Sequence, residues 1–294
     1  MRLATIEQGG RSAAAVVLAD GTFAATDEVV PGAPRDVLGV IDAGPTLWAR
    51  LAEGSRDRRG ARDGARLAAP IPRPRRNAFC VGWNYAEHFA EDKARLARGD
   101  QLPEAPAFFT KNPATVVGPD AAVRFPAPYS EQLDWEVELV AVVGTRGRDV
   151  RESDAASHVF GYTIANDVSV RDVQQKRHGG QWFKGKNFDT HLPLGPWIVT
   201  PDEIGDPQAL RITSRVNGVT KQDSSTRQMV FTVARILSEL AAGLALEPGD
   251  LVLTGTPPGV GYARTPPEYL RPGDVMEMEI EKIGVLRNRV ELMR

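Results

Sequence analysis

The sequence lacks the features that mark several classes of protein. Its 294 residues include one cysteine, Cys80, so no internal disulfide can form, and no cysteine and histidine spacing suggests a zinc site. No apolar run approaches the roughly 18 residues of a membrane-spanning helix. Glu7, Gly9 and Arg11 interrupt the N-terminal segment where a secretion signal would be apolar. We therefore expect a cytoplasmic protein with no membrane partner.

Neither sign of charge is in excess. The chain has 36 basic and 38 acidic side chains and a formal net charge of -2, which gives no electrostatic reason to expect nucleic acid as a partner. Apolar residues make up 42% of the chain and charged residues 25%, the composition of a globular protein with a substantial core. The chain has no phosphate-binding Gly-Lys-Ser/Thr motif, which argues against nucleotide binding.

Turn residues and apolar runs predict two domains. Residues 1–70 alternate short apolar runs with turn signals, which indicates a small β-rich module with a helix over residues 37–51. Residues 53–77 are rich in arginine, glycine and proline; Asp57 and Asp63 dilute the positive charge, so a solvated linker is favoured over a polyanion-binding patch. Residues 71–294 are mostly strand-like, so we expect an α+β, β-rich fold divided at residue 70.

Two local patterns stand out in the second domain. Asn217-Gly218 lies between two strand-like runs, which predicts a two-residue β-hairpin turn. Apolar residues recur at helical spacing from Val230 to Leu244, with candidate caps at residues 224–226, which predicts a helix.

Two strand-like runs carry glutamates at alternate positions. In VMEMEI the glutamates share one face and apolar residues the other, as expected for a strand with one face in water. In LDWEVELVAVV, Glu136 and Glu138 share a face with Val140 and Val142, so both faces are largely apolar and the strand should be buried on both sides. Two buried carboxylates about 7 Å apart would need a cation between them; the alternative is an exposed patch or a strand end.

A third carboxylate strengthens the case for a metal site. GYTIAND is strand-like and ends at Asp167, and Ser169 to Asp172 has the pattern of a capped helix start. Three carboxylates without cysteine favour a hard ion, Mg²⁺, with Mn²⁺ or Ca²⁺ as alternatives.

The sequence offers two further reactive groups. Lys184 and Lys186, two of only seven lysines, lie in the glycine-flanked segment GGQWFKGKNFD; they either belong to a mobile surface loop or hold a substrate oxygen near the ion. His88 and Glu91 are three residues apart, so on a helix the carboxylate would orient the imidazole as a base, unless they form an ordinary exposed pair.

The remaining candidates are polar groups near the predicted site. Arg171 and Gln174 repeat the three-residue spacing and either reach a substrate or face solvent. The loop LTGTPPGVG is either a tight turn or a place where backbone amides and the Thr256 hydroxyl receive a substrate carboxylate. The other three histidines have no comparable partner and are interpreted as structural.

The order of the motifs resembles the fumarylacetoacetate hydrolase family. The resemblance rests on FCVGWNYAEH, PAFFTKNP, LDWEVEL, GYTIANDVSVRDVQ, GQWFKGKNFDTHLPLGPWIVT and LVLTGTPPGVG, which cover the chain from about Phe79 onward. It implies a mixed β-roll, usually homodimeric. Asn84 stands where some members have an aspartate ligand, so three protein carboxylates are expected, and the run from Lys93 to Ala105 is longer than in the shortest members.

The resemblance also assigns roles to residues of this sequence. It implies that the metal ligands are Glu136, Glu138 and Asp167. It implies a catalytic dyad of His88 and Glu91, with Lys186 as the active-site lysine. The implied substrate contacts are Tyr85, Arg171, Gln174 and Thr256.

The implied substrate is a small 2-oxo or dicarbonyl acid. The first expectation is Mg²⁺-dependent hydrolysis of a carbon-carbon bond in an acylpyruvate or related 2,4-dioxo acid through a metal-stabilised enolate. The alternatives are isomerisation or decarboxylation of a 2-oxo diacid or a compound like 2-hydroxyhepta-2,4-diene-1,7-dioate from aromatic catabolism, and a non-catalytic ligand-binding protein on the same fold.

Overall fold

Most strands of the chain belong to one long sheet. The computed structural model describes residues 1–59, 64–91, 99 and 101–292; most of residues 93–105 therefore lie outside the described part. The eleven-stranded sheet has the order β3 (Phe23–Ala25), β2 (Arg11–Val17), β1 (Arg2–Gln8), β13 (Leu192–Val199), β11 (Val159–Asn166), β10 (Val137–Val143), β16 (Leu251–Leu253), β5 (Ala78–Gly82) and β6 (Ala107–Lys111), with β4 (Arg66–Ala68) beside β1 and β7 (Val116–Val117) beside β13.

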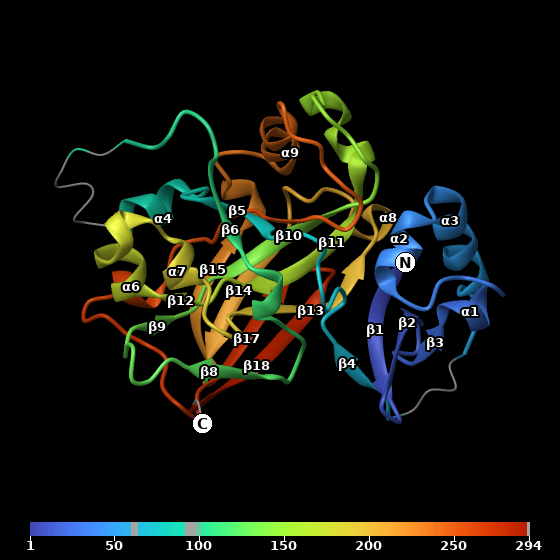
Figure 1. The fold of residues 1–294 in the computed structure, drawn as a ribbon, viewed down its shortest axis with the longest axis horizontal. Coiled ribbons are helices and arrows are strands. Elements are labelled where there is room, and N and C mark those ends of the chain that lie inside the picture. The colour runs from blue at the N-terminus through green and yellow to red at the C-terminus, as the bar shows by residue number, and fades with distance from the viewer. Residues whose placement is uncertain (60–63, 92–98, 100, 293–294) are drawn as a thin grey trace.

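A second sheet packs against the first (Figure 1). Its order is β15 (Val219–Ser225), β14 (Arg211–Val216), β17 (Val275–Ile280), β18 (Gly284–Leu292) and β8 (Ala122–Phe125), and a separate pair joins β12 (Ser169–Val170) to β9 (Leu133–Asp134). These sheets confirm the strand-rich α+β fold.

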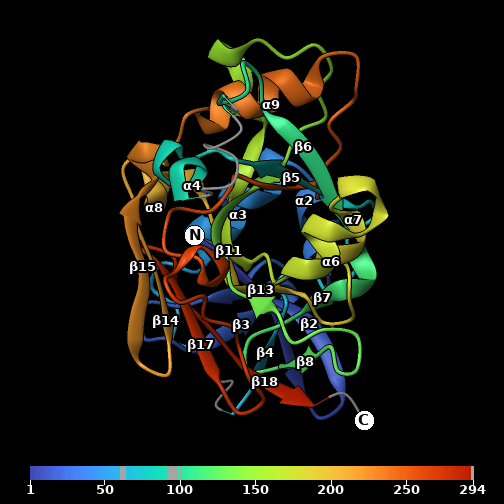
Figure 2. The same ribbon diagram turned by 90° about the vertical axis from the view of Figure 1, so that its left-hand side faces the viewer.

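Short helices surround the sheets (Figure 2). The α-helices are α1 (Thr26–Val29), α2 (Val37–Asp42), α3 (Pro45–Gly54), α4 (Ala86–Glu91), α6 (Arg171–Lys176), α7 (Phe183–Lys186), α8 (Pro201–Ile204) and α9 (Val233–Ala241). The 3₁₀ helices are Pro113–Thr115, Glu152–His158, His178–Gly180, Thr226–Gln228 and Gly261–Ala263. Helices α1 to α3 gather with the N-terminal strands, and α4, α6 and α7 lie on the opposite side of the molecule (Figure 1). None of the helices in the described residues is long and apolar enough to cross a membrane.

Strand β10 lies at the centre of the core, and the prediction that both of its faces are buried is confirmed. Its odd-numbered side chains pack with the five-stranded sheet, and its even-numbered valines pack with the N-terminal strands and helices. Glu136 and Glu138 continue the even-numbered face toward the start of the strand. By contrast, β17 alternates buried and half-buried residues, which confirms the interpretation of its glutamates as a water-facing row.

Residues 53–77 are only in part a solvated connection, because most of residues 53–59 are exposed, whereas the residues after the undescribed segment 60–63 include a strand. Helix α3 extends to Gly54, β4 pairs with β1, and Arg76 Nε donates to Asp250 Oδ1 over 2.9 Å. Arg66, Arg75 and Arg76 bind carboxylates that are distant in sequence, which the composition does not reveal. Because β1 also pairs with β13, the strands of residues 1–70 extend the sheet of the later residues; the division at residue 70 stays a prediction.

Two predicted helices have different boundaries in the structure. Gly44, with φ 79°, and Pro45 divide the predicted helix 37–51 into α2 and α3. Helix α9 begins after Thr232, whose side chain accepts from the Arg235 amide, whereas residues 224–226 lie in β15 and the following 3₁₀ turn. The hairpin prediction is confirmed, because Asn217 and Gly218 have φ values of 52° and 76° between β14 and β15.

The burial of His191 in this core can be tested by measuring how the stability of the protein depends on pH. Burial lowers its pKa to about 3, and its Nε2 lies 3.0 Å from the Arg124 carbonyl oxygen. The unfolded chain takes up a proton near pH 6.5 and the folded chain does not, so stability is present above pH 6.5 and falls as pH drops toward 3. Between pH 7 and 5 the free energy of unfolding should therefore fall by about 2 kcal/mol less in His191→Gln than in the unaltered protein. Urea unfolding at both pH values measures this, and parallel losses in the two proteins would contradict it.

Candidate metal centre and active-site cavity

Three carboxylates meet where β10 begins and β11 ends. The two strands are antiparallel neighbours with Val137 opposite Asn166, and the Asp167 amide donates to the Glu136 carbonyl over 2.9 Å. Carboxylate oxygens of Glu136, Glu138 and Asp167 all lie within 4.8 Å of one another, and all three residues are buried. The structure therefore brings together the three residues that the sequence suggested as metal ligands.

Basic side chains surround two of these carboxylates. Lys186 Nζ lies 2.7 Å from Glu136 Oε2 and 2.7 Å from Asp167 Oδ2. Arg171 Nη1 lies 2.6 Å from Glu136 Oε1, and Lys111 Nζ lies 2.7 Å from Asp167 Oδ1. Glu138 instead accepts the Gly255 amide over 2.7 Å and forms no ion pair with a lysine or arginine among the described residues.

This unequal distribution of charge fits a divalent cation. Burial and the neighbouring Asp167 and Glu136 raise the pKa of Glu138 well above its usual value. Burial opposes ionisation of Glu136 as well, but Lys186 and Arg171 outweigh it and lower the pKa of Glu136. A cation near Glu138 would supply the missing positive charge, and a set of oxygen ligands suits Mg²⁺ or Mn²⁺.

Lys186 is buried rather than part of a mobile surface loop. It ends helix α7, where its amide donates to the Trp182 carbonyl over 3.2 Å, and only 2% of the residue is exposed. Gly185 allows α7 to pack on α6, because a Cβ there would lie 2.5 Å from the Gln174 nitrogen. Lys184 is exposed, with its Nζ 4.5 Å from the centre of the Phe188 ring.

His88 and Glu91 form the pair that their spacing suggested. Both lie on α4, with His88 Nδ1 3.0 Å from Glu91 Oε2. The other carboxylate oxygen of Glu91 accepts the Gly259 amide over 2.6 Å, so the glutamate is held between α4 and the loop that follows β16. This fixed carboxylate orients the imidazole.

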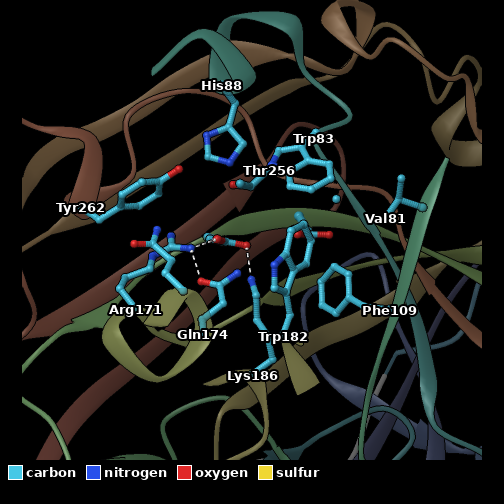
Figure 3. Close-up of a pocket in the computed structure, with 14 residues that line it drawn as sticks. Val81, Trp83, His88, Phe109, Arg171, Gln174, Trp182, Lys186, Thr256 and Tyr262 are labelled. Atoms are coloured by element: carbon cyan, nitrogen blue, oxygen red, sulfur yellow. Dashed lines mark hydrogen bonds and ion pairs between the residues drawn. The ribbon is translucent and has the colours of Figure 1, made fainter. Parts of the chain in front are cut away.

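These groups surround one cavity of about 50 Å³ (Figure 3). His88 points into it from α4, Arg171 and Tyr262 lie on one side, and Trp182 and Phe109 lie on another (Figure 3). The lining also includes Val81, Gly82, Trp83, Glu136, Glu138, Gln174, Gln175, Lys186 and Thr256. Metal-ligand candidates, a base and two cations therefore share one space.

Helix α6 supplies the cavity with a fixed guanidinium. Arg171 Nε donates to Asp134 Oδ2 over 2.7 Å, Nη1 donates to Gln174 Oε1 over 3.1 Å, and the Tyr262 ring centre lies 4.4 Å from Cζ. Its buried Nη2 has no hydrogen-bond partner in the described part of the chain. The predicted helix cap at Ser169 is wrong, because this residue belongs to β12 and its hydroxyl donates to the Asp167 carbonyl.

Two expectations about substrate contacts do not fit the structure. Tyr85 is fully buried and is not among the residues that line the cavity. The amides of Gly255 and Gly259 are used by the protein's own carboxylates, Glu138 and Glu91, rather than being free for a substrate.

Thr256 lines the cavity, but its hydroxyl already has two protein partners. It donates to the Val137 carbonyl over 3.0 Å and accepts from Gln222 Nε2 over 2.7 Å. Asn84, which stands where an aspartate ligand was considered, instead donates to the Phe231 and Thr254 carbonyls. Both side chains therefore hold the loops around the site together.

Sequence reasoning missed several residues of the site. Lys111, Asp134 and Gln222 contact the proposed ligands or their neighbours through long-range pairs. The aromatic lining was also missed, including Trp83, which has φ 56° and meets Trp182 edge-on with ring centres 4.5 Å apart. The signal for Lys111 was its place at the end of the apolar run PAFFTK in a chain with only seven lysines.

Comparisons with known proteins identify the family of this chain. The family description "Fumarylacetoacetate (FAA) hydrolase C-terminal" matches residues 77–291. The chain is 46% identical over 222 residues to the mitochondrial oxaloacetate tautomerase FAHD2A of Bos taurus, covering 76% of this chain and 68% of that one. It is 43% identical over 225 residues to oxaloacetate tautomerase YisK of Bacillus subtilis (strain 168), covering 76% and 73%.

Solved structures share the fold over the whole chain. A fumarylacetoacetate hydrolase from Exiguobacterium antarcticum matches with a TM-score of 0.85 at 38% identity, covering 100% of both chains. The maleylpyruvate hydrolase of Sphingobium sp. SYK-6, solved with manganese(II) and pyruvate, matches with a TM-score of 0.80 at 27% identity, again covering 100% of both. The chain belongs to the fumarylacetoacetate hydrolase family.

Proposed function

We propose that this protein interconverts the keto and enol forms of a small 2-oxo dicarboxylic acid such as oxaloacetate, with Mg²⁺ or Mn²⁺ as cofactor. The observation that carries the proposal is that one cavity is lined by Glu136 and Glu138 of the carboxylate trio, by a histidine base and by two cations. The relatives named oxaloacetate tautomerases support the choice of substrate.

The ion would be held by Glu136, Glu138 and Asp167, and it would stabilise negative charge that develops on the oxo oxygen. Arg171 and Lys186 bind the carboxylates of the substrate. The unpartnered Nη2 of Arg171 is buried, and a charge-assisted hydrogen bond to a substrate carboxylate would satisfy it. The cation pair explains why an anionic substrate is favoured.

His88 moves the proton. Because Nδ1 faces Glu91, we assign the hydrogen of the neutral ring to Nδ1 and the role of base to Nε2. In the keto-to-enol direction Nε2 takes a proton from the carbon beside the oxo group. The C–H electron pair becomes the carbon–carbon double bond, and the carbonyl π pair moves to oxygen, which takes a proton from solvent. The protonated His88 then releases its proton to solvent. In the reverse direction His88 takes a proton from solvent and gives it to carbon, while the enol oxygen loses its proton to solvent.

Hydrolysis is the second candidate function. The contact of Glu91 with the Gly259 amide fixes the base, and a fixed base could equally remove a proton from water and lead to carbon-carbon cleavage of an acylpyruvate. The neighbouring structure of a maleylpyruvate hydrolase favours keeping this reaction. Decarboxylation and ligand binding without turnover use the same cavity and are decided by the same assay. Isomerisation of a ring-fission diacid from aromatic catabolism uses it too, and is decided by adding such a diacid to the panel.

The test supplies enol oxaloacetate and a panel of acylpyruvates to the Mg²⁺-loaded protein in ¹⁸O-labelled water. We expect the ultraviolet absorbance of the enol to decay faster with the protein than without it, with oxaloacetate recovered intact. ¹⁸O in a new carboxylate of an acylpyruvate product would establish hydrolysis instead, carbon dioxide release would establish decarboxylation, and binding without turnover would leave a ligand-binding protein.

Removing the ion is expected to stop the reaction. Without a divalent cation, Glu138 repels its two neighbours and the developing negative charge loses its main stabiliser. We expect treatment with a chelator to lower turnover at least about 10²-fold, and added Mg²⁺ or Mn²⁺ to restore it. Turnover that continues unchanged in the chelator would contradict the metal-dependent proposal.

Assembly and location stay predictions. We expect a homodimer in the cytoplasm, and light scattering coupled to size-exclusion chromatography would measure the assembly.

A further inference from the structure

Lys111 is a fully buried lysine that the proposed reaction does not use. It ends the edge strand β6, and its side chain is 0% exposed. Its Nζ donates to Asp167 Oδ1 over 2.7 Å and to the Val168 carbonyl over 3.1 Å. Burying an ammonium group is costly unless it is paired, so a lysine here calls for a specific reason.

The two lysines beside Asp167 occupy different surroundings. Lys186 bonds to Oδ2 and also to Glu136, and it lines the cavity. Lys111 bonds to Oδ1 and is not among the lining residues. An incoming ion would compete with Lys186 for both of its carboxylates, whereas the second bond of Lys111 goes to a backbone carbonyl that follows Asp167.

Hydrogen bonds of the Asn187 side chain fix the positions of Lys111 and Lys186 relative to each other. Asn187, directly after Lys186, donates from Nδ2 to the Thr110 carbonyl over 3.1 Å, and its Oδ1 accepts the Asn112 amide. These bonds attach the residue after Lys186 to the residues on both sides of Lys111. Strand β6 and helix α7 therefore deliver one ammonium group to each oxygen of the Asp167 carboxylate.

We propose that Lys111 is a positioning residue that fixes the Asp167 carboxylate for the divalent ion, whereas Lys186 is the lysine that faces the substrate. This inference rests on the proposed metal-dependent function. Lys111 keeps Oδ1 in place by a bond anchored at the Val168 carbonyl, which leaves Oδ2 for the ion once Lys186 turns to the substrate. Because it acts through Asp167, its loss should weaken metal binding more than the chemical step.

The test compares Mn²⁺ affinity in three proteins by titration followed with electron paramagnetic resonance. Lys111→Met removes the ammonium group and keeps an unbranched side chain, and Lys184→Met is the matched control on the exposed lysine of α7. We expect the Mn²⁺ Kd of Lys111→Met to rise about 10- to 100-fold, the range for losing a group that orients a ligand. The Kd of Lys184→Met should stay within about twofold of the unaltered protein.

Turnover at saturating Mn²⁺ separates positioning from catalysis. We expect Lys111→Met to regain turnover to within about threefold of the unaltered protein, because Lys111 does not face the substrate. A folded Lys111→Met with unchanged Mn²⁺ affinity would overturn the inference, even if its melting temperature fell, since that result describes a purely structural lysine. If Lys111→Met does not fold, Lys111→Gln, which also removes the positive charge, takes its place, and unchanged affinity there would overturn the inference too.

The two proposals fail in different ways. Unaltered protein that binds no Mn²⁺ would overturn both. Unaltered protein that binds Mn²⁺ but turns over no 2-oxo diacid would overturn the proposed reaction alone, and the affinities of the variants would still decide the role of Lys111.

Discussion

Glu138→Gln is expected to lower turnover by at least about 10²–10³-fold, the loss typical of removing one electrostatic stabiliser of a transition state. Glu138 is the member of the trio that has no lysine or arginine partner among the described residues, and it accepts a hydrogen bond from the Gly255 amide over 2.7 Å. Its charge is therefore the one most available to a cation. The amide side chain keeps the shape and removes the charge. Steady-state kinetics with Mg²⁺ measures the effect.

The same substitution should not harm the metal-free fold. Burial and the repulsion of Asp167 and Glu136 already work against the ionised form of Glu138, so a neutral isostere removes an unfavourable interaction. We expect the melting temperature of the metal-free variant to be unchanged or higher, and Mn²⁺ to stabilise the variant less than the unaltered protein because it binds less tightly.

Glu279→Gln is the matched control for this prediction. Glu279 lies on β17, also in a row of alternating glutamates, but it faces water and pairs with Arg215 over 2.9 Å. We expect its turnover to match that of the unaltered protein within about twofold, because exposed ion pairs contribute little. Equal losses in the two variants, or full activity in Glu138→Gln, would contradict the metal centre.

The contrast between these two strands was visible in the sequence because it is local. Alternation with a period of two assigns each side chain of a strand to a face, so the apolar neighbours of Glu136 and Glu138 already indicated burial on both sides. The pair His88 and Glu91 is equally local, since residues three apart share a face of a helix. Asp167 needed one further assumption, that a residue at a strand end contributes to a site.

The rest of the site depends on contacts that no local pattern encodes. Lys111 meets Asp167 across 56 residues, and Gln222 meets Thr256 across 34. The position of Arg76 could not be predicted from the composition of residues 53–77 for the same reason, because the carboxylate of Asp250 that binds it is 174 residues away. Lys186 illustrates the limit most clearly: the glycines around it indicate a loop, yet Gly185 is there because α7 packs directly on the Gln174 backbone.

His88→Asn is expected to lower kcat by about 10²–10⁴-fold, the usual contribution of a general acid–base group, while Mn²⁺ affinity stays within about threefold. His88 lines the cavity and contacts Glu91, but it is not one of the three carboxylate residues proposed to hold the ion. For Lys111→Met we expect the reverse, a loss of Mn²⁺ affinity with little loss of turnover at saturating Mn²⁺. The two variants together therefore distinguish the role of the base from that of the metal centre. Kinetics at saturating Mg²⁺ and a Mn²⁺ titration measure the two quantities.

His178→Asn is the control for this last prediction. His178 is exposed and has φ 52°, a conformation that asparagine tolerates, and it is not among the residues that line the active-site cavity. Its kcat should equal that of the unaltered protein. If His88→Asn instead retains full kcat on the enol of oxaloacetate but loses acylpyruvate cleavage, the histidine serves water activation alone. Proton transfer at carbon would then have to use another group of the cavity, of which Lys186, held between Glu136 and Asp167, is the candidate.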